Sequence, residues 1–384
     1  MALTSDLRYD FWDILKAPRL AISGKNLIAQ ARPLWYGYLA YLVLTYLALM
    51  FQGQSFAEIW SRLTLFPILG CEYSHWYSFA LWIAGILIVI GFYDYGNLKV
   101  AKLAFEEVRG NYFYPHAAAA TDARANLLPL WVAGGLVLLL IAVLAAIQSV
   151  LSLIALIPGV GEVLYALLYA VPFFLWSLFL VFLAFGLTTG ILTLPAIIVA
   201  REKETFGATF YIYNIIWSQP LRWLGTTVVG IALAKIGIWV LGYFFMRALQ
   251  LTNFLSTLFA GEKAGNILMS AYNLLEPARP LLNFFTTLYP GSSIGYDWIS
   301  FGGQYQPVGA EYIAAIIIAL ALLALWIVII SYGINIITCS QLLGFLLVHY
   351  KEDKVKLTED IANRTPEPNE IIPDKPLTDD RLPS

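Results

Sequence analysis

Long apolar segments are the feature that most constrains this chain. Several reach eighteen residues or more, and the sequence from Leu127 to Ala200 is almost continuously apolar. About 20 helical residues cross a hydrocarbon layer of about 30 Å, so each segment is long enough to span a membrane. Of the 384 residues, 60% are hydrophobic and 12% are charged, whereas soluble domains are about 45–50% apolar and about 25% charged. The sequence therefore predicts an all-α integral membrane protein in contact with a lipid bilayer.

The number of spans depends on how the stretch from Leu127 to Ala200 is divided. Pro158 and Gly159 form a turn signal that separates two long helices. Three shorter helices also fit by length, because Pro172 offers a second break. Two helices place the cations that follow Ala200 on the same side as the N-terminus, and this agreement favours a six-span bundle. The predicted spans are about 33–51, 76–95, 127–157, 163–200, 224–246 and 310–348.

The distribution of Lys and Arg predicts which side of the membrane each connection occupies. With six spans, 18 cations lie on the side of the two termini, and the opposite side has only Arg62, Arg247, Lys263 and Arg279. Cytoplasmic loops of membrane proteins carry the excess of Lys and Arg. The sequence therefore predicts a multi-pass protein with both termini in the cytoplasm.

Three segments outside the spans have distinct compositions. Residues 1–32 mix aromatic and basic side chains and are predicted to be a cytoplasmic interfacial segment, broken at Pro18; a lipid-specific binding site is the alternative. Residues 250–309 are too apolar for a free loop and predict helices that form an outer cap. Residues 351–384 are rich in Pro and charge and are predicted to be largely disordered.

Two further stretches extend this plan on the predicted cytoplasmic side. The sequence KVAKLAFEEVRG, which begins at Lys99, predicts a short surface helix with one apolar face. The second half of the last span contains Asn335, Thr338, Ser340 and Gln341. These polar groups indicate either packing against other helices or emergence from the membrane as a stalk.

The connector between the fourth and fifth spans carries a stripe of aromatic residues. Phe206, Phe210, Tyr213 and Trp217 recur at spacings of four, three and four residues, which is one face of a helix. Aromatic rings prefer the membrane interface, so this candidate interfacial platform is predicted to lie flat on the cytoplasmic face and to end near Pro220. The alternative is that the stripe packs against the bundle.

Lys235 is the most prominent charge within a predicted span. An ammonium group near the membrane centre costs about 2.5–3.5 kcal/mol on insertion scales, so it needs a partner, a hydrated cavity or the bundle interior. Glu162 and Asp94 are the candidate partners, and with Lys235 they form a candidate intramembrane polar site. A purely structural ion pair, or a side chain that extends to the interface, is the alternative.

The motifs of the common catalytic and cofactor sites are not found in the sequence. His75, His116 and His349 lie in three separate segments, and Cys71 and Cys339 fall on opposite predicted sides, so no metal-ligand spacing results. We therefore expect no catalytic residue, metal or cofactor. The membrane topology accounts for the basic surface, so we expect no nucleic-acid partner.

A resemblance to known proteins rests mainly on the connector. The string LPAIIVAREKETFGATFYIYNIIWSQPLRWLG combines Pro195, Glu202 or Glu204, Ala208, Pro220 with Arg222, and Leu224. It resembles an uncharacterised bacterial family of polytopic inner-membrane proteins, as do the segments FWDILKAPRLAISGKNL and HYKEDKVKLTED. A looser similarity is to the membrane domains attached to glycerophosphodiester phosphodiesterases. The resemblance implies a helical bundle in the bacterial inner membrane and supplies no reaction.

Two functional hypotheses follow. The sequence favours a non-enzymatic scaffold or accessory subunit of a membrane complex, because long helices and interfacial segments are present without recognisable chemistry. The alternative is a transporter or lipid-binding permease that uses a central polar cavity around Lys235. A membrane enzyme is a weaker third hypothesis, since it would need carboxylates or histidines that converge only in space.

Overall fold

The structure is a computed structural model that describes residues 7–65, 67, 75–200, 205–275, 309–354 and 357–358. Predictions about the charged cluster 201–204, about residues 276–308 of the outer cap and about most of the tail lie outside these residues. The described chain consists of helices joined by turns, without a strand. The predicted all-α fold is therefore confirmed.

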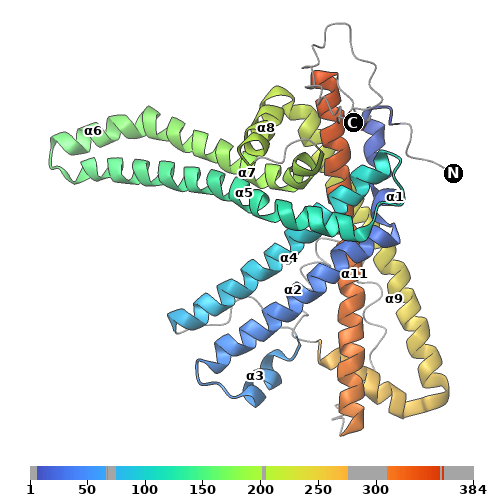
Figure 1. Ribbon diagram of the computed structural model, residues 1–384. Coiled ribbons are helices and arrows are strands. Elements are labelled where there is room, and N and C mark those ends of the chain that lie inside the picture. The colour runs from blue at the N-terminus through green and yellow to red at the C-terminus, as the bar shows by residue number, and fades with distance from the viewer. Residues whose placement is uncertain are drawn as a thin grey trace, which may run out of the picture.

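The described residues contain six helices that are long and apolar enough to cross a membrane. They are α2 (Gly24–Met50), α4 (Trp76–Val108), α5 (His116–Ser152), α6 (Val160–Leu168) together with α7 (Phe174–Ala200), α9 (Pro220–Asn273) and α11 (Ala310–Asp353). Between α6 and α7, Pro172 lies in a single π-helical turn, η3 (Tyr169–Phe173), and the chain continues without reversing (Figure 1). The six-span division is therefore confirmed.

Four short helices complete the described chain. They are η1 (Phe11–Lys16), α1 (Ala17–Ala21), α3 (Phe56–Leu63) and α8 (Thr205–Ser218). A 3-10 turn, η2 (Leu153–Leu156), follows directly after α5. Helix α8 ends just before Pro220, as predicted from the sequence of the connector. Its orientation relative to a membrane stays a prediction.

The long helices converge at one end of the molecule and diverge at the other (Figure 1). We call the converged end the head. It comprises η1, α1, α8 and residues 24–32, 96–108, 116–130, 193–200, 220–234 and 331–353, which supply most of the largest buried apolar cluster. Beyond the head, large apolar side chains on α2, α4, α5, α7 and α9 are exposed, as expected for helices whose solvent is lipid.

The two ends of the described chain meet in the head. The rings of Tyr9 and Tyr350 lie 4.4 Å apart between centroids, and the hydroxyl groups of Tyr9 and Thr358 are 2.6 Å apart. An even number of spans returns the chain to its starting side, and this contact agrees with that topology.

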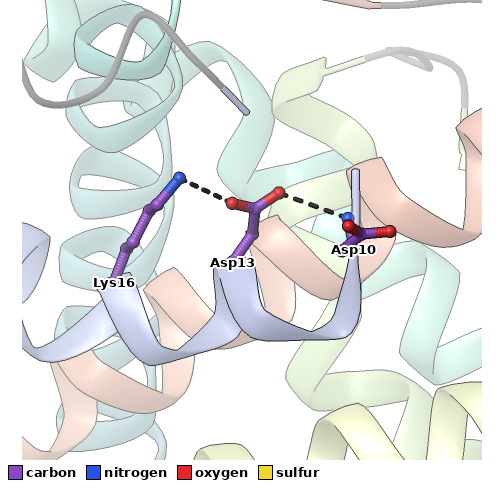
Figure 2. Close-up of polar contacts among 3 residues, drawn as sticks. All are labelled: Asp10, Asp13 and Lys16. Atoms are coloured by element: carbon purple, nitrogen blue, oxygen red, sulfur yellow. Dashed lines mark hydrogen bonds and ion pairs between the residues drawn. The ribbon is translucent and has the colours of Figure 1, made fainter. Parts of the chain in front are cut away.

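The N-terminal segment packs more closely than an interfacial segment was expected to. Ile14, Ala17 and Leu20 are buried, while Phe11 and Trp12 are exposed on the other side. Figure 2 shows the buried Asp13 carboxylate between two partners: it accepts hydrogen bonds from Lys16 Nζ at 2.6 Å and from the Asp10 backbone N–H at 3.3 Å. The change from η1 to α1 comes just before Pro18, and α2 already begins at Gly24, nine residues before the predicted span.

The surface helix predicted from Lys99 onward is wrong as a separate element. Helix α4 runs without interruption from Trp76 to Val108, because the sequence after the apolar span contains good helix formers and no proline. The expected apolar face is present: Val100, Leu103, Ala104 and Val108 are all buried in the head. The span therefore extends into the head as one rigid helix.

Prolines lie inside three helices near the level where these helices leave the head. Pro33 is in α2, Pro129 in α5 and Pro195 in α7. A proline has no N–H for the hydrogen bond to the carbonyl four residues earlier and its ring crowds that carbonyl, so the helix is weaker there. Each proline lies within two residues of the limit of the head on its helix.

Helices α9 and α11 pack closely because glycines occupy their contact face. A Cβ atom built on Gly230 would lie 2.8 Å from Ser340 Cβ, and one on Gly333 would lie 2.5 Å from Ile238 Cγ1. Small residues allow two membrane helices to approach closely, and dispersion contacts then hold them together. Farther along, α9 turns at Gly261, where the backbone φ angle is 57°.

At the end opposite the head, a second apolar cluster supports the described part of the predicted outer cap. After the turn at Gly261, the end of α9 crosses toward α11 and α3 (Figure 1). The cluster joins Ala271, Leu274 and Leu275 to Leu65 and to the first turns of α11. Thr64 Oγ1 also donates a hydrogen bond of 2.6 Å to the Leu274 carbonyl oxygen.

Helices α5, α6 and α7 form a long hairpin that extends away from the other spans (Figure 1). We call residues 138–185 the hairpin arm. Within it, Gln148 Nε2 donates to Ser177 Oγ at 2.9 Å, and Trp176 Nε1 donates to the Leu144 carbonyl oxygen at 3.1 Å. Most of its large apolar side chains are exposed, and they include Leu139, Val150, Leu167 and Val181.

Candidate functional site

The head contains a core of buried polar side chains, and α11 supplies its centre. Ser331, Asn335, Thr338, Ser340 and Gln341 are all at most 5% exposed. The C-terminal half of α11 carries them because it is surrounded by α1, α2, α4, α7 and α9. The packing of these residues against other helices is confirmed, and the emergence of this part of α11 from the membrane stays a prediction.

One side of this core is a cluster of four amide side chains and one hydroxyl group. We call it the amide cluster, and its members are Asn26, Gln30, Asn97, Asn335 and Thr338. Asn335 Nδ2 donates to the Asn26 carbonyl oxygen at 2.9 Å, and Thr338 Oγ1 donates to Asn97 Oδ1 at 3.2 Å. Gln30 Nε2 donates to the Tyr93 carbonyl oxygen at 3.4 Å. The cluster therefore joins α2, α4 and α11 through neutral hydrogen bonds.

Three acceptors of the amide cluster receive no hydrogen bond within the described part of the chain. They are Asn26 Oδ1, Gln30 Oε1 and Asn335 Oδ1, and each belongs to a fully buried residue. An unsatisfied buried acceptor costs about 1–3 kcal/mol. The amide cluster is therefore a costly element of the head, and its fixed backbone contacts define the register of α2 against α11.

A neighbouring face of α11 forms a second network, the Gln341 network: Thr193, Trp223, Thr227 and Gln341. Thr193 Oγ1 donates to Gln341 Oε1 at 2.7 Å, and Gln341 Nε2 donates to Thr227 Oγ1 at 3.1 Å. Trp223 Nε1 donates to Thr193 Oγ1 at 3.3 Å, and Thr227 Oγ1 donates to the Trp223 carbonyl oxygen at 3.0 Å. This closed network ties α7, α9 and α11 together.

Near the end of α11, His349 forms a third polar contact. Its Nδ1 atom lies 2.8 Å from the hydroxyl group of Tyr211 on α8. The His349 ring is stacked on Phe345, with an interplanar angle of 2°. Because His349 is buried, this contact positions α8 against α11.

The structure does not bring the predicted polar site together. Lys235 lies on an exposed face of α9, and Glu162 is exposed in α6; Figure 1 shows α6 and α9 on opposite sides of the molecule. Asp94 is half-buried, and its Oδ2 atom accepts a hydrogen bond of 2.9 Å from Trp131 Nε1 on α5. The three residues therefore occupy three separate places, and no central cavity around Lys235 is seen in the described chain.

The predicted aromatic stripe is divided between two environments. Phe210 and Trp217 are 73% and 80% exposed, as expected for an interfacial platform. Tyr213 instead packs against Gly186 of α7, and its hydroxyl group donates to the Leu183 carbonyl oxygen at 3.1 Å. The side chain of Phe206 lies outside the described atoms. The buried face of α8 is formed by Ala208, Ile212 and Ile215.

The amide cluster and the Gln341 network consist of neutral donors and acceptors. Within the described residues, no group of three or more His, Cys, Asp or Glu side chains is placed to hold a metal ion. Sequence reasoning missed Asn26, Gln30 and Asn97, although the spacing of four between Asn26 and Gln30 among apolar neighbours was a usable signal of one buried polar face.

Comparison with known proteins gives no match to a protein-family model, to a curated protein or to a solved structure.

Proposed function

We propose that this integral membrane protein is a non-enzymatic scaffold or accessory subunit of a membrane complex, and that the hairpin arm is its contact surface for a partner subunit. The supporting observation is the hairpin arm, whose large apolar side chains are mostly exposed and whose two sides are joined by the hydrogen bonds of Gln148 and Trp176. The head supplies a rigid base from which the arm extends.

A helix that is hydrophobic on all sides can be surrounded by lipid alone. Association between membrane helices instead depends on closely packed surfaces with small residues. At the base of the hairpin arm, small residues already serve this purpose within the chain. Gly186 and Gly190 of α7 are covered by Tyr213 and Ile212 of α8, and with Gly134 they line a small apolar cavity. The surface left for a partner is therefore the exposed apolar length of the arm itself, which supports a scaffold over an isolated bundle.

Removing apolar atoms from the hairpin arm is expected to release the partner. We expect wild-type protein, extracted in mild detergent, to form a particle heavier than one chain, as measured by native mass spectrometry. The combined substitutions Leu139→Ala, Val150→Ala and Val181→Ala should reduce this particle to the single chain. These side chains are 59%, 63% and 63% exposed, so their removal affects the partner contact more than the fold.

A matched control removes equally exposed apolar atoms from α9. The substitutions Val228→Ala, Ile231→Ala and Ile236→Ala, at positions that are 56%, 48% and 59% exposed, should leave the heavier particle intact. Wild-type protein that is recovered only as a single chain would contradict the proposal. Equal dissociation of both sets of variants would assign the effect to general contact with lipid.

We also propose that the head lies in the cytoplasm of a bacterial cell and that the spans cross the inner membrane, within the inner-membrane family that the connector resembles. The excess of Lys and Arg on the side of the termini supports this orientation. In intact cells, a membrane-impermeant thiol reagent should modify the variant Ala57→Cys, which is exposed on α3, and should not modify Thr121→Cys in the head.

The labelling experiment uses a chain in which Cys71 is replaced by Ser, and the buried Cys339 is retained because the reagent cannot reach it. Permeabilised cells serve as the control, since both variants should then react. Modification of Thr121→Cys in intact cells, with Ala57→Cys protected, would reverse the proposed orientation.

A further inference from the structure

A group of cations lies where three helices leave the head. Helix α4 packs against both α2 and α5, and Lys99 on α4 is within electrostatic range of both Arg32 on α2 and Arg124 on α5. Arg32 and Arg124 are exposed, and Lys99 is half-buried. We call these three residues the boundary cations. Like charges repel at this range, so a cluster of this kind is stable only when water or an anion compensates it.

The boundary cations differ from three other cations of the head, which are paired with carboxylates. Lys102 and Arg109 lie 3.0 and 3.7 Å from the carboxylate of Glu106, and Lys16 lies 2.6 Å from that of Asp13. Within the described residues, the boundary cations form no ion pair; the polar contact of Arg32 is a hydrogen bond of 3.4 Å from Nε to the Tyr36 hydroxyl group. Asp13 and Glu106 thus neutralise Lys16, Lys102 and Arg109 and leave the boundary cations positive.

All three boundary cations share one level relative to the membrane. Arg32 directly precedes the first apolar span, Arg124 precedes the third by less than one turn, and Lys99 follows the second by about one turn. The headgroup region is expected at this level. Two partly exposed aromatic side chains, Tyr36 and Trp131, lie just inside it, which is the usual position of an aromatic belt.

An apolar strip continues from these charges into the membrane. On α5, Leu128 and Val132 follow Arg124 at intervals of four residues and are 71% and 40% exposed. An acyl chain can lie along this strip while its phosphate remains beside the cations. A soluble anion would use only the charges, whereas a phospholipid uses both features.

We propose that Arg32, Lys99 and Arg124 bind the phosphate group of an anionic phospholipid, whose acyl chain lies along the Leu128 face of α5. This site goes beyond the proposed scaffold role and does not depend on it. Basic residues at the membrane surface attract anionic lipids by about 1 kcal/mol each. Because α4 lies between α2 and α5, the bound lipid joins the bases of these three helices.

The test uses the full chain in detergent and measures the binding of phosphatidylglycerol by native mass spectrometry, with phosphatidylcholine as the neutral lipid. We expect the combined substitutions Arg32→Gln, Lys99→Gln and Arg124→Gln to weaken phosphatidylglycerol binding about fivefold per cation, or about 100-fold together. Binding of phosphatidylcholine should not change.

A control with the same loss of charge uses Arg62→Gln, Arg222→Gln and Lys263→Gln. Among the described residues, Arg62 and Arg222 contact Gln54 and Gln219, and Lys263 lies 3.9 Å from Glu311, so none belongs to the boundary cations. This variant should bind phosphatidylglycerol like the wild type. An equal loss in both variants, or no loss in the first, would overturn the site.

Two further measurements separate the remaining outcomes. The charge-preserving variant Arg32→Lys, Lys99→Arg and Arg124→Lys should retain lipid binding within about threefold, and added salt should weaken the binding of wild-type protein. Both measurements test the site even if the glutamine variant does not fold. Inorganic phosphate in excess should not displace the lipid; complete displacement would identify a site for free anions and overturn the lipid assignment.

Discussion

Replacing Gly230 with leucine should lower the free energy of unfolding by about 3 kcal/mol, at the upper end of the usual range for overpacking. The physical reason is the contact between α9 and α11, where a Cβ atom on residue 230 would overlap Ser340 Oγ and would lie 2.8 Å from Ser340 Cβ. Ser340 Cβ is fixed by the backbone of α11, so the helices must separate.

The measurement is the unfolding midpoint in a mild detergent, followed by the loss of helical circular dichroism. Gly242→Leu is the matched control on the same helix, because a Cβ atom there meets only Ile329 Cγ2 at 3.9 Å, which is an ordinary contact. That variant should change stability by less than about 1 kcal/mol. Equal effects at the two positions would show that the close approach of α9 and α11 does not hold the bundle together.

The second large effect is expected at Gln341. Replacing it with leucine removes the hydrogen bonds to Thr193 Oγ1 and Thr227 Oγ1 and leaves two buried hydroxyl groups with fewer partners. We expect a loss of about 2 kcal/mol, since each unsatisfied buried group costs about 1–3 kcal/mol and hydrogen bonds between membrane helices average about 0.6 kcal/mol.

A double substitution distinguishes this cause from lost packing. Thr193→Val combined with Gln341→Leu removes both the hydroxyl group and its partner, so the pair should be less destabilising than the sum of the two single variants. The same unfolding assay measures all three. Strict additivity would contradict a coupled Gln341 network, because independent side chains have no interaction energy.

The sequence was sufficient for the number of spans because length and apolar content decide whether a helix crosses a membrane. The turn at Pro158 and Gly159 could be predicted for a different, local reason. The backbone φ angle of Gly159 is 81°, and few residues other than glycine tolerate such an angle. Pro172, by contrast, ends no helix, since one π-helical turn accommodates it.

The head could not be predicted from local pattern. The charges from Lys99 onward indicated a loop with a surface helix, but the helical propensity of that stretch continues α4 through it. Asn26 and Gln30 precede the first apolar span and therefore resembled part of an interfacial segment. Their spacing of four residues indicated one polar face, but that face is buried by tertiary contacts with α4 and α11, which the spacing does not identify.

The candidate polar site shows the same limit for a single residue. Hydropathy placed Lys235 within a span, but the direction of its side chain depends on which face of α9 packs against α11. Gly230, Ala234 and Gly237 occupy that face, and Lys235 is next to it on the exposed side.

The buried face of α8 could not be identified from the sequence either, because two faces of this helix are apolar. The aromatic stripe forms one of them, and the buried face is the other, formed by Ala208, Ile212 and Ile215.

The prolines at the base of the divergent spans have a consequence for the kinds of membrane that the protein can occupy. Bilayers differ in hydrophobic thickness by several ångströms, and a span adapts to a mismatch by tilting, at a cost of fractions of a kcal/mol per ångström. Pro33, Pro129 and Pro195 weaken three helices near the edge of the head. Each of these spans can therefore change its tilt to match the surrounding lipid while the hydrogen-bonded head keeps one form.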